Sequence, residues 1–184
     1  MIIAERLRQT NRAEYILYMW QVEDILRAYH LDLDELREHY LSGFQLSPED
    51  MAKTEGWYAD LCRMMAEEGL REGGHLQINK NALSDLEELH TRLLRSEKFP
   101  YYRQMYYRVL PYIVELRAKN QGMDTTAHPT ELETCFNALY GVLILRMQGK
   151  TVSDETQKAA KDISTLLGQL SEYYQKDKEE PLDL

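Results

Sequence analysis

The chain has 184 residues, a formal net charge of −9, and a composition of 43% hydrophobic and 29% charged residues. This length suits one domain with a sizeable core, and the composition is typical of a soluble globular protein. The acidic balance argues against a surface that tracks nucleic-acid phosphates or an anionic membrane. We therefore expect neither nucleic acid nor membrane as a partner.

The same sequence indicates a cytoplasmic protein. Cys62 and Cys135 lie in apolar helical patterns and form no disulfide framework. The N-terminus is charged from Glu5 onward and lacks the apolar core of a signal peptide. The longest uncharged run, 134–145, is far shorter than the roughly 20 residues needed to span a bilayer.

Helical periodicity and capping residues define the predicted elements. Residues 2–9 form either a short helix or a lead-in segment. Asn11 with Glu14 and Asp32 with Glu35 resemble capping boxes, and Ser47-Pro48 is a strong helix start. Residues 75–80 are expected to be a loop, with Asn79 or Asn81 capping the next helix. The predicted helices span residues 12–29, 33–41, 48–70, about 80–97, 100–120, 129–147 and 154–175.

Two prolines and one apolar stretch add detail to the second half. Pro111 predicts a kink or break in the tyrosine-rich helix, because proline lacks the donor for its turn. Thr126 to His128 lead into Pro129, which is expected at the first position of the following helix. That helix is apolar nearly all round and should be central. We thus predict an all-α, single-domain bundle of six or seven helices over residues 1–175, with a flexible charged tail at 176–184.

The segment 11–29 holds the first candidate site. On a helical wheel its apolar face is wide, and Glu14 and Gln21 fall at the flank of that face. Buried polar groups need partners, so Glu14, Tyr18 and Gln21 are a candidate polar pocket. Structural roles for Glu14 in the capping box and for Gln21 between helices explain the same pattern. Glu23 and Arg27 are expected on the solvent side, paired at i, i+4.

A metal site and a tyrosine cluster are the other two candidate sites in the sequence. Carboxylate-bridged metal sites in bundles need two Glu-x-x-His motifs, and only Glu87-x-x-His90 occurs here. We therefore predict no metal or cofactor, although Glu87 and His90 would be the ligands if one bound. The cluster around Pro111 favours core packing or a dimer interface over a ligand pocket. Its candidate residues are Tyr102, Tyr106 and Tyr112.

The segment Ala13 to Arg27, AEYILYMWQVEDILR, resembles a bacterial, all-helical family of unknown function. The resemblance is carried by Glu14, Tyr15, Tyr18, Met19, Trp20, Gln21, Glu23 and Asp24. It implies a cytoplasmic helical protein and supplies no activity, cofactor or catalytic residue.

The sequence also lacks the common catalytic motifs G-x-S-x-G, P-loop and H-E-x-x-H. The leading hypothesis is a non-enzymatic helical protein that acts through protein contacts, as a homodimer or with a protein partner. The alternative is a bundle that binds a small molecule or a metal, and that could be an enzyme.

Overall fold

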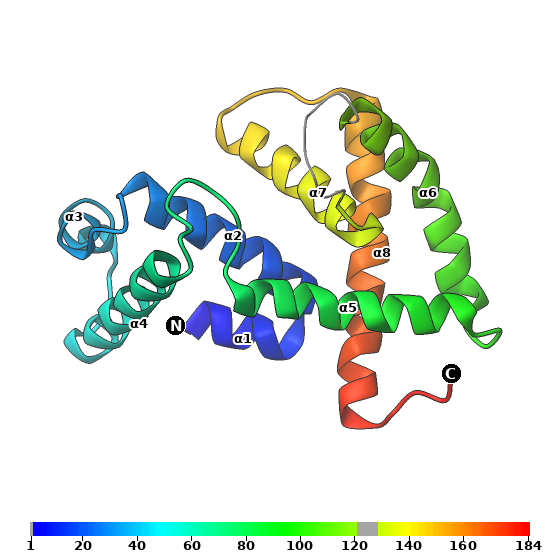
Figure 1. The fold of residues 1–184 in the computed structure, drawn as a ribbon, viewed down its shortest axis with the longest axis horizontal. Helices are drawn as coiled ribbons and strands as arrows, with labels where there is room; N and C mark the ends of the chain where they lie inside the picture. Colours follow the sequence, from blue (N-terminus) through cyan, green and yellow to red (C-terminus); the bar gives the residue numbers. More distant parts are fainter. Residues whose placement is uncertain (1, 121–128) are drawn as a thin grey trace. The chain divides into compact units, whose positions relative to one another are not determined.

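The computed structural model describes residues 2–120 and 129–184, and over these residues helices are the only regular secondary structure (Figure 1). Eight α-helices are present in the described residues, so the predicted six or seven was a small miscount. The N-terminal segment, left open between helix and lead-in, is a helix of its own. The helices are α1 (Ile2–Thr10), α2 (Arg12–Ala28), α3 (Leu33–His39), α4 (Pro48–Glu67), α5 (Gln77–Arg95), α6 (Pro100–Asn120), α7 (Glu131–Met147) and α8 (Asp154–Glu179), with a 3-10 turn at Leu41–Gly43.

The chain divides into two compact units. The first contains residues 1–9 and 14–82, and the second contains residues 10–13 and 83–184, so the boundary falls within α5. In the first unit, α3 packs on α4, and the fully buried side chains include Ile16, Met19, Leu26, Leu36, Tyr58 and Met65. In the second unit, α6, α7 and α8 contact one another pairwise around Tyr102, Phe136, Leu166 and Leu170.

Several helix starts follow the predicted capping chemistry. The Asp32 side chain accepts the backbone N–H groups of Asp34 and Glu35 at the start of α3. Ser47 caps α4 by accepting the N–H of Asp50, with Pro48 in the first turn. Ser153 caps α8 in the same way. These starts are encoded locally, because cap and helix are adjacent in the chain.

The predicted start of α7 was wrong by two residues. Thr130, and not a residue before Pro129, is the N-cap, and it forms a complete capping box with Glu133. Pro129 therefore lies outside the helix and is not its first residue. Thr126 to His128 lie outside the described residues. A full capping box satisfies two backbone donors at once, which outweighs the preference of proline for the first turn.

Pro111 does not break α6, which is one continuous helix from Pro100 to Asn120. Pro111 is exposed, so the carbonyl that loses its helical partner can be hydrated. The missing hydrogen bond is much less costly there than in a buried turn.

The helix α7 is not buried all round. Its packed face carries Leu132, Cys135, Phe136 and Val142, whereas Asn137, Gly141 and Met147 are exposed. The expectation of a central helix was therefore wrong. The α7 sequence carries more apolar surface than its contacts with α6 and α8 cover.

The helix α8 extends to Glu179, beyond the expected start of the tail at Lys176. Lys176 pairs with Glu172 one turn earlier at 2.6 Å. Asp177 forms an ion pair with Arg92 of α5 at 2.9 Å, and this contact holds the pKa of Asp177 below its usual range. The contact with α5 thus stabilises a last turn of α8 that the charged composition had assigned to the tail.

Candidate functional site

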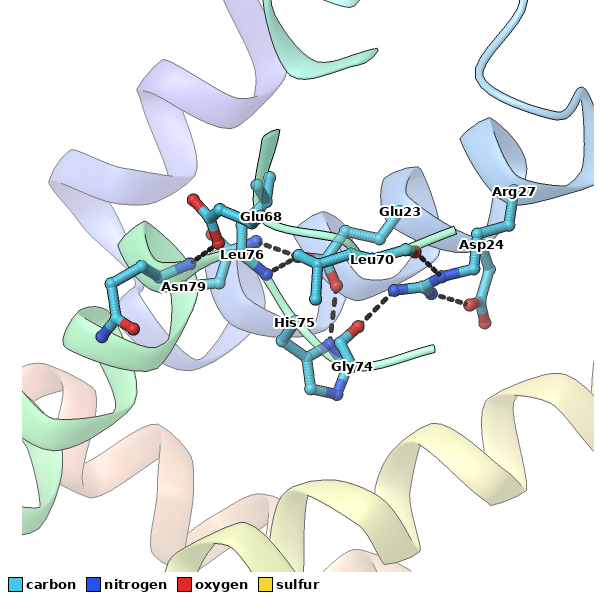
Figure 2. Close-up of polar contacts among 10 residues, drawn as sticks. Glu23, Asp24, Arg27, Glu68, Leu70, Gly74, His75, Leu76 and Asn79 are labelled. Carbon is cyan, nitrogen blue, oxygen red and sulfur yellow. Dashed lines mark hydrogen bonds and ion pairs between the residues drawn. The ribbon is translucent and has the colours of Figure 1, made fainter. Parts of the chain in front are cut away.

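The most developed polar site in the described residues surrounds Glu23 in the first unit (Figure 2). Glu23 lies on α2 between Trp20 and Leu26, and its side chain is completely buried. The helix forms because apolar residues recur at helical spacing, and Glu23 stands within that buried stripe. A buried carboxyl group at such a position must find hydrogen-bond partners.

Three donors from the start of α5 meet this carboxyl group. Its Oε1 accepts the backbone N–H of Leu76 at 2.8 Å and the side-chain amide of Asn79 at 2.7 Å. Its Oε2 lies 2.6 Å from Nδ1 of His75. Figure 2 shows the three donors converging on Glu23 from the same stretch of chain. Glu23 thus serves as a long-range cap for α5, and a negative group is favoured at the positive end of the helix dipole.

A second carboxyl group completes this cap from the surface. Glu68, which is exposed, accepts the backbone N–H of Gln77 at 2.8 Å. The predicted loop at 75–80 holds for residues 75 and 76 and is wrong from Gln77 onward, because α5 begins there and Asn79 lies inside its first turn. The capping groups are 53 and 9 residues away in the chain, so no local sequence signal marks the start.

The loop before α5 is held by Arg27. Its Nε donates to the carbonyl of Leu70 at 3.1 Å, and another guanidinium nitrogen donates to the carbonyl of Gly74. Gly74 has φ +86°, and a Cβ there would lie 3.0 Å from Leu70, so glycine is required. Arg27 also pairs with Asp24 at 2.7 Å. The expected Glu23–Arg27 pair is wrong, since Glu23 points inward to α5 and Arg27 holds the loop.

Among the residues of this site, His75 is the one whose side chain could take part in a reaction. Its ring stacks on Trp20 with centroids 4.1 Å apart and an interplanar angle of 12°. The carboxylate of Glu23 contacts the ring at Nδ1, so Nε2 is the ring nitrogen left for any other contact. The His75 side chain is 28% exposed, so solvent reaches the ring. The arrangement can orient a base, but its demonstrated contacts are those of a cap.

The sequence-predicted pocket residues on α2 lie elsewhere. Glu14 is exposed, and Tyr18 and Gln21 are half-buried. The expectation that Glu14 would be partly buried was therefore wrong, because the apolar stripe is centred on Ile16, Met19 and Leu26. Burial raises the pKa of the Tyr18 hydroxyl. A ligand-binding role for Glu14, Tyr18 and Gln21 stays a prediction.

The second unit brings several predicted residues together. His90 is 6% exposed, and its Nδ1 lies 2.5 Å from the hydroxyl of the fully buried Tyr102. Tyr106 lies against the His90 ring and donates to Glu131 at 2.8 Å. Burial lowers the pKa of His90 to about 4 and raises that of Tyr106 to about 12, where the hydrogen bond to Glu131 adds to the effect.

The Glu-x-x-His pair does not converge on one point. Glu87 accepts from the Thr130 hydroxyl, whereas His90 faces Tyr102. His90 Nε2 is buried without a hydrogen-bond partner. No group of three metal-ligating side chains gathers anywhere in residues 2–120 and 129–184. Tyr112 lies apart from this cluster, at a cavity between α6, α7 and α8.

Sequence reasoning missed Glu23, although a signal existed. Residues 16, 19, 20, 23 and 26 follow helical spacing, and four of them are apolar. A glutamate inside such a stripe is a candidate for burial. Its partners His75, Leu76 and Asn79 could not be found this way, because they lie more than 50 residues away in the chain.

Comparison with known proteins agrees with this description without adding an activity. No described helix has the length and apolar character that crossing a membrane requires. Searches of curated proteins and of solved structures return no significant match. The model of a family described as a domain of unknown function, DUF4924, matches residues 1–181. This match covers nearly the whole chain, which therefore belongs to the DUF4924 family.

Proposed function

We propose that this chain is a non-enzymatic protein that acts through protein contacts, as a homodimer formed by the outer face of α6. The observation that carries the proposal is a row of large exposed apolar side chains on that helix. Tyr101 is 77% exposed, and Tyr107 and Val114 are each 60% exposed. Pro111, also exposed, lies between the last two.

The spacing of these residues supports a single surface. Residues 101, 104, 107, 108, 111, 114 and 115 are all exposed and recur every three or four positions, so they share one side of the helix. Tyrosine and arginine are enriched at protein interfaces, where they combine apolar area with hydrogen-bonding tips. Single exposed apolar residues are ordinary, whereas several on one side of a helix are typical of a contact surface.

The charges on this face favour a second copy of the same chain. Arg108 and Glu115 lie at nearly equal distances on either side of Pro111. In an antiparallel pair of α6 helices that cross near Pro111, Arg108 of each copy faces Glu115 of the other, whose carboxylate also pairs with Lys119 of its own chain at 2.6 Å. Tyr107 then lies near Val114 of the partner copy. A twofold interface requires such a self-complementary patch.

Charge reversal tests this pairing. Size-exclusion chromatography with light scattering should give twice the 21.7 kDa chain mass for the unaltered protein at micromolar concentrations. Arg108→Glu alone and Glu115→Arg alone should each weaken the dimer, since each places like charges opposite one another. The double variant should restore it. Arg63→Glu, at an exposed arginine of α4, is the matched control and should leave the mass unchanged.

Two results would refute the proposal. One is a monomeric mass at every concentration up to the highest that stays soluble. The other is a dimer that survives both single charge reversals, which would place the interface elsewhere.

We also propose a cytoplasmic location. Both cysteines are buried thiols, Cys62 in the first unit and Cys135 in the second. Unpaired thiols are typical of a reducing compartment. Fluorescent tagging at the C-terminus, followed by cell fractionation, tests this location, and recovery in a secreted fraction would contradict it.

A further inference from the structure

The second unit contains a cavity of about 310 Å³ between α6, α7 and α8. It exists because small residues face each other where α7 passes α8. Ala138 and Gly141 line it from α7, and Ala159 and Ala160 line it from α8. Its volume is at the lower end of the range of small-molecule sites.

The walls of the cavity are apolar and its rim is polar. Each of the three helices contributes an apolar side chain to the walls: Leu116 from α6, Val142 from α7 and Ile163 from α8. Val142 and Ile163 are buried, whereas Asn137 is exposed at the lining. An apolar floor with a few polar groups at the edge fits a molecule with an apolar body and one polar end.

The charges at the rim indicate the sign of that polar end. Glu115, Lys119 and Glu155 all line the cavity. Lys119 pairs with Glu115 at 2.6 Å, and Glu115 and, more weakly, Glu155 raise the pKa of Lys119, so the three side chains together carry one net negative charge. The chain as a whole carries −9, so its field attracts cations and repels anions.

Packing against the described residues does not require a glycine at position 141. A Cβ built on Gly141 meets nothing within 4 Å, and glycine inside a helix costs about 1 kcal/mol relative to alanine. A Cβ built on Gly168 of α8 also meets nothing within 4 Å, and Gly168 does not line the cavity. The two glycines thus form a matched pair for testing the cavity.

We propose that this cavity binds a small amphipathic amine, with its apolar body between α7 and α8 and its ammonium group at Glu155. The site is separate from the Glu23 cap, and binding requires no dimer. Its test uses residues outside α6, so failure of this inference and failure of the proposed dimer are distinguishable.

The experiment is a titration of the full chain with phenethylamine, followed by amide chemical shifts. Saturable shifts are expected for α7 and α8 around residues 138–145 and 155–163. Phenylacetate, with the same ring and the opposite charge, should bind at least fivefold more weakly. Gly141→Leu should abolish binding by filling the cavity, whereas Gly168→Leu should not change it.

A second pair of variants tests the role of charge. Glu155→Gln should weaken phenethylamine binding about twofold to fivefold, the range of an exposed ion pair. Glu172→Gln, an exposed glutamate of α8 that does not line the cavity, should leave binding unchanged. Equal binding of the two probes, an unaltered affinity in Gly141→Leu, or the absence of saturable shifts would each overturn the inference.

Discussion

The buried cap at Glu23 makes a sharp prediction about stability. Glu23→Leu keeps a similar side-chain volume but removes the carboxylate that His75, Leu76 and Asn79 contact at the start of α5. The N–H of Leu76 and the amide of Asn79, both buried, then lose their partner. Each unsatisfied buried donor costs about 1–3 kcal/mol, and the added apolar burial of leucine offsets part of this. We expect a net loss of about 3 kcal/mol in the free energy of unfolding.

The exposed partner of this cap provides the matched control. Glu68→Leu removes the acceptor of the Gln77 N–H at the same helix start. Glu68 is exposed, so water can replace the acceptor, and the expected loss is below about 1 kcal/mol. The difference between the two losses in unfolding free energy therefore measures the effect of burying the cap, apart from the effect of capping the helix.

A third variant separates hydrogen bonding from charge. In Glu23→Gln, the amide oxygen can still accept from Leu76 and Asn79, and the amide nitrogen can donate to His75 Nδ1 once the imidazole changes tautomer. The expected loss is about 1 kcal/mol, the difference between a charge-assisted and a neutral set of bonds.

Urea denaturation and amide hydrogen exchange measure these effects. Unfolding midpoints should rank Glu68→Leu and Glu23→Gln well above Glu23→Leu. The amides of residues 76–79 should exchange faster in Glu23→Leu than in Glu68→Leu. The reasoning is refuted if Glu23→Leu is as stable as Glu68→Leu, or if protection at the start of α5 is unchanged.

Two further predictions concern buried groups. The pKa of His90 is lowered from 6.5 to about 4 by burial, so the unfolded chain binds more protons between these values. Stability should therefore fall by about 3 kcal/mol as the pH drops from 6.5 to 4, and urea titrations of His90→Gln should show a shallower slope there. An equal slope would contradict the effect. Burial raises the pKa of Cys135 to about 12 and that of Cys62 above its usual range. Ellman's reagent should then react with both thiols only in urea, and rapid labelling of the native chain would disprove their burial.

Some features of this protein were determined by the sequence itself. Asp32, Ser47 and Ser153 begin their helices because each side chain accepts N–H groups two or three residues ahead. The all-helical class follows from apolar spacing that repeats every three to four residues in each segment. These signals depend on neighbours within one turn, so an isolated sequence contains them.

Tertiary structure decided the start of α5 and the character of its cap. Gln77 begins that helix because Glu23 and Glu68 accept the N–H groups that no nearby side chain satisfies. It also decided that α7 is covered on one side only, and that α8 continues to Glu179 beside Arg92. In each case the deciding group comes from a distant part of the chain. Burial and hydrogen-bond partners of this kind arise only when separate helices pack together.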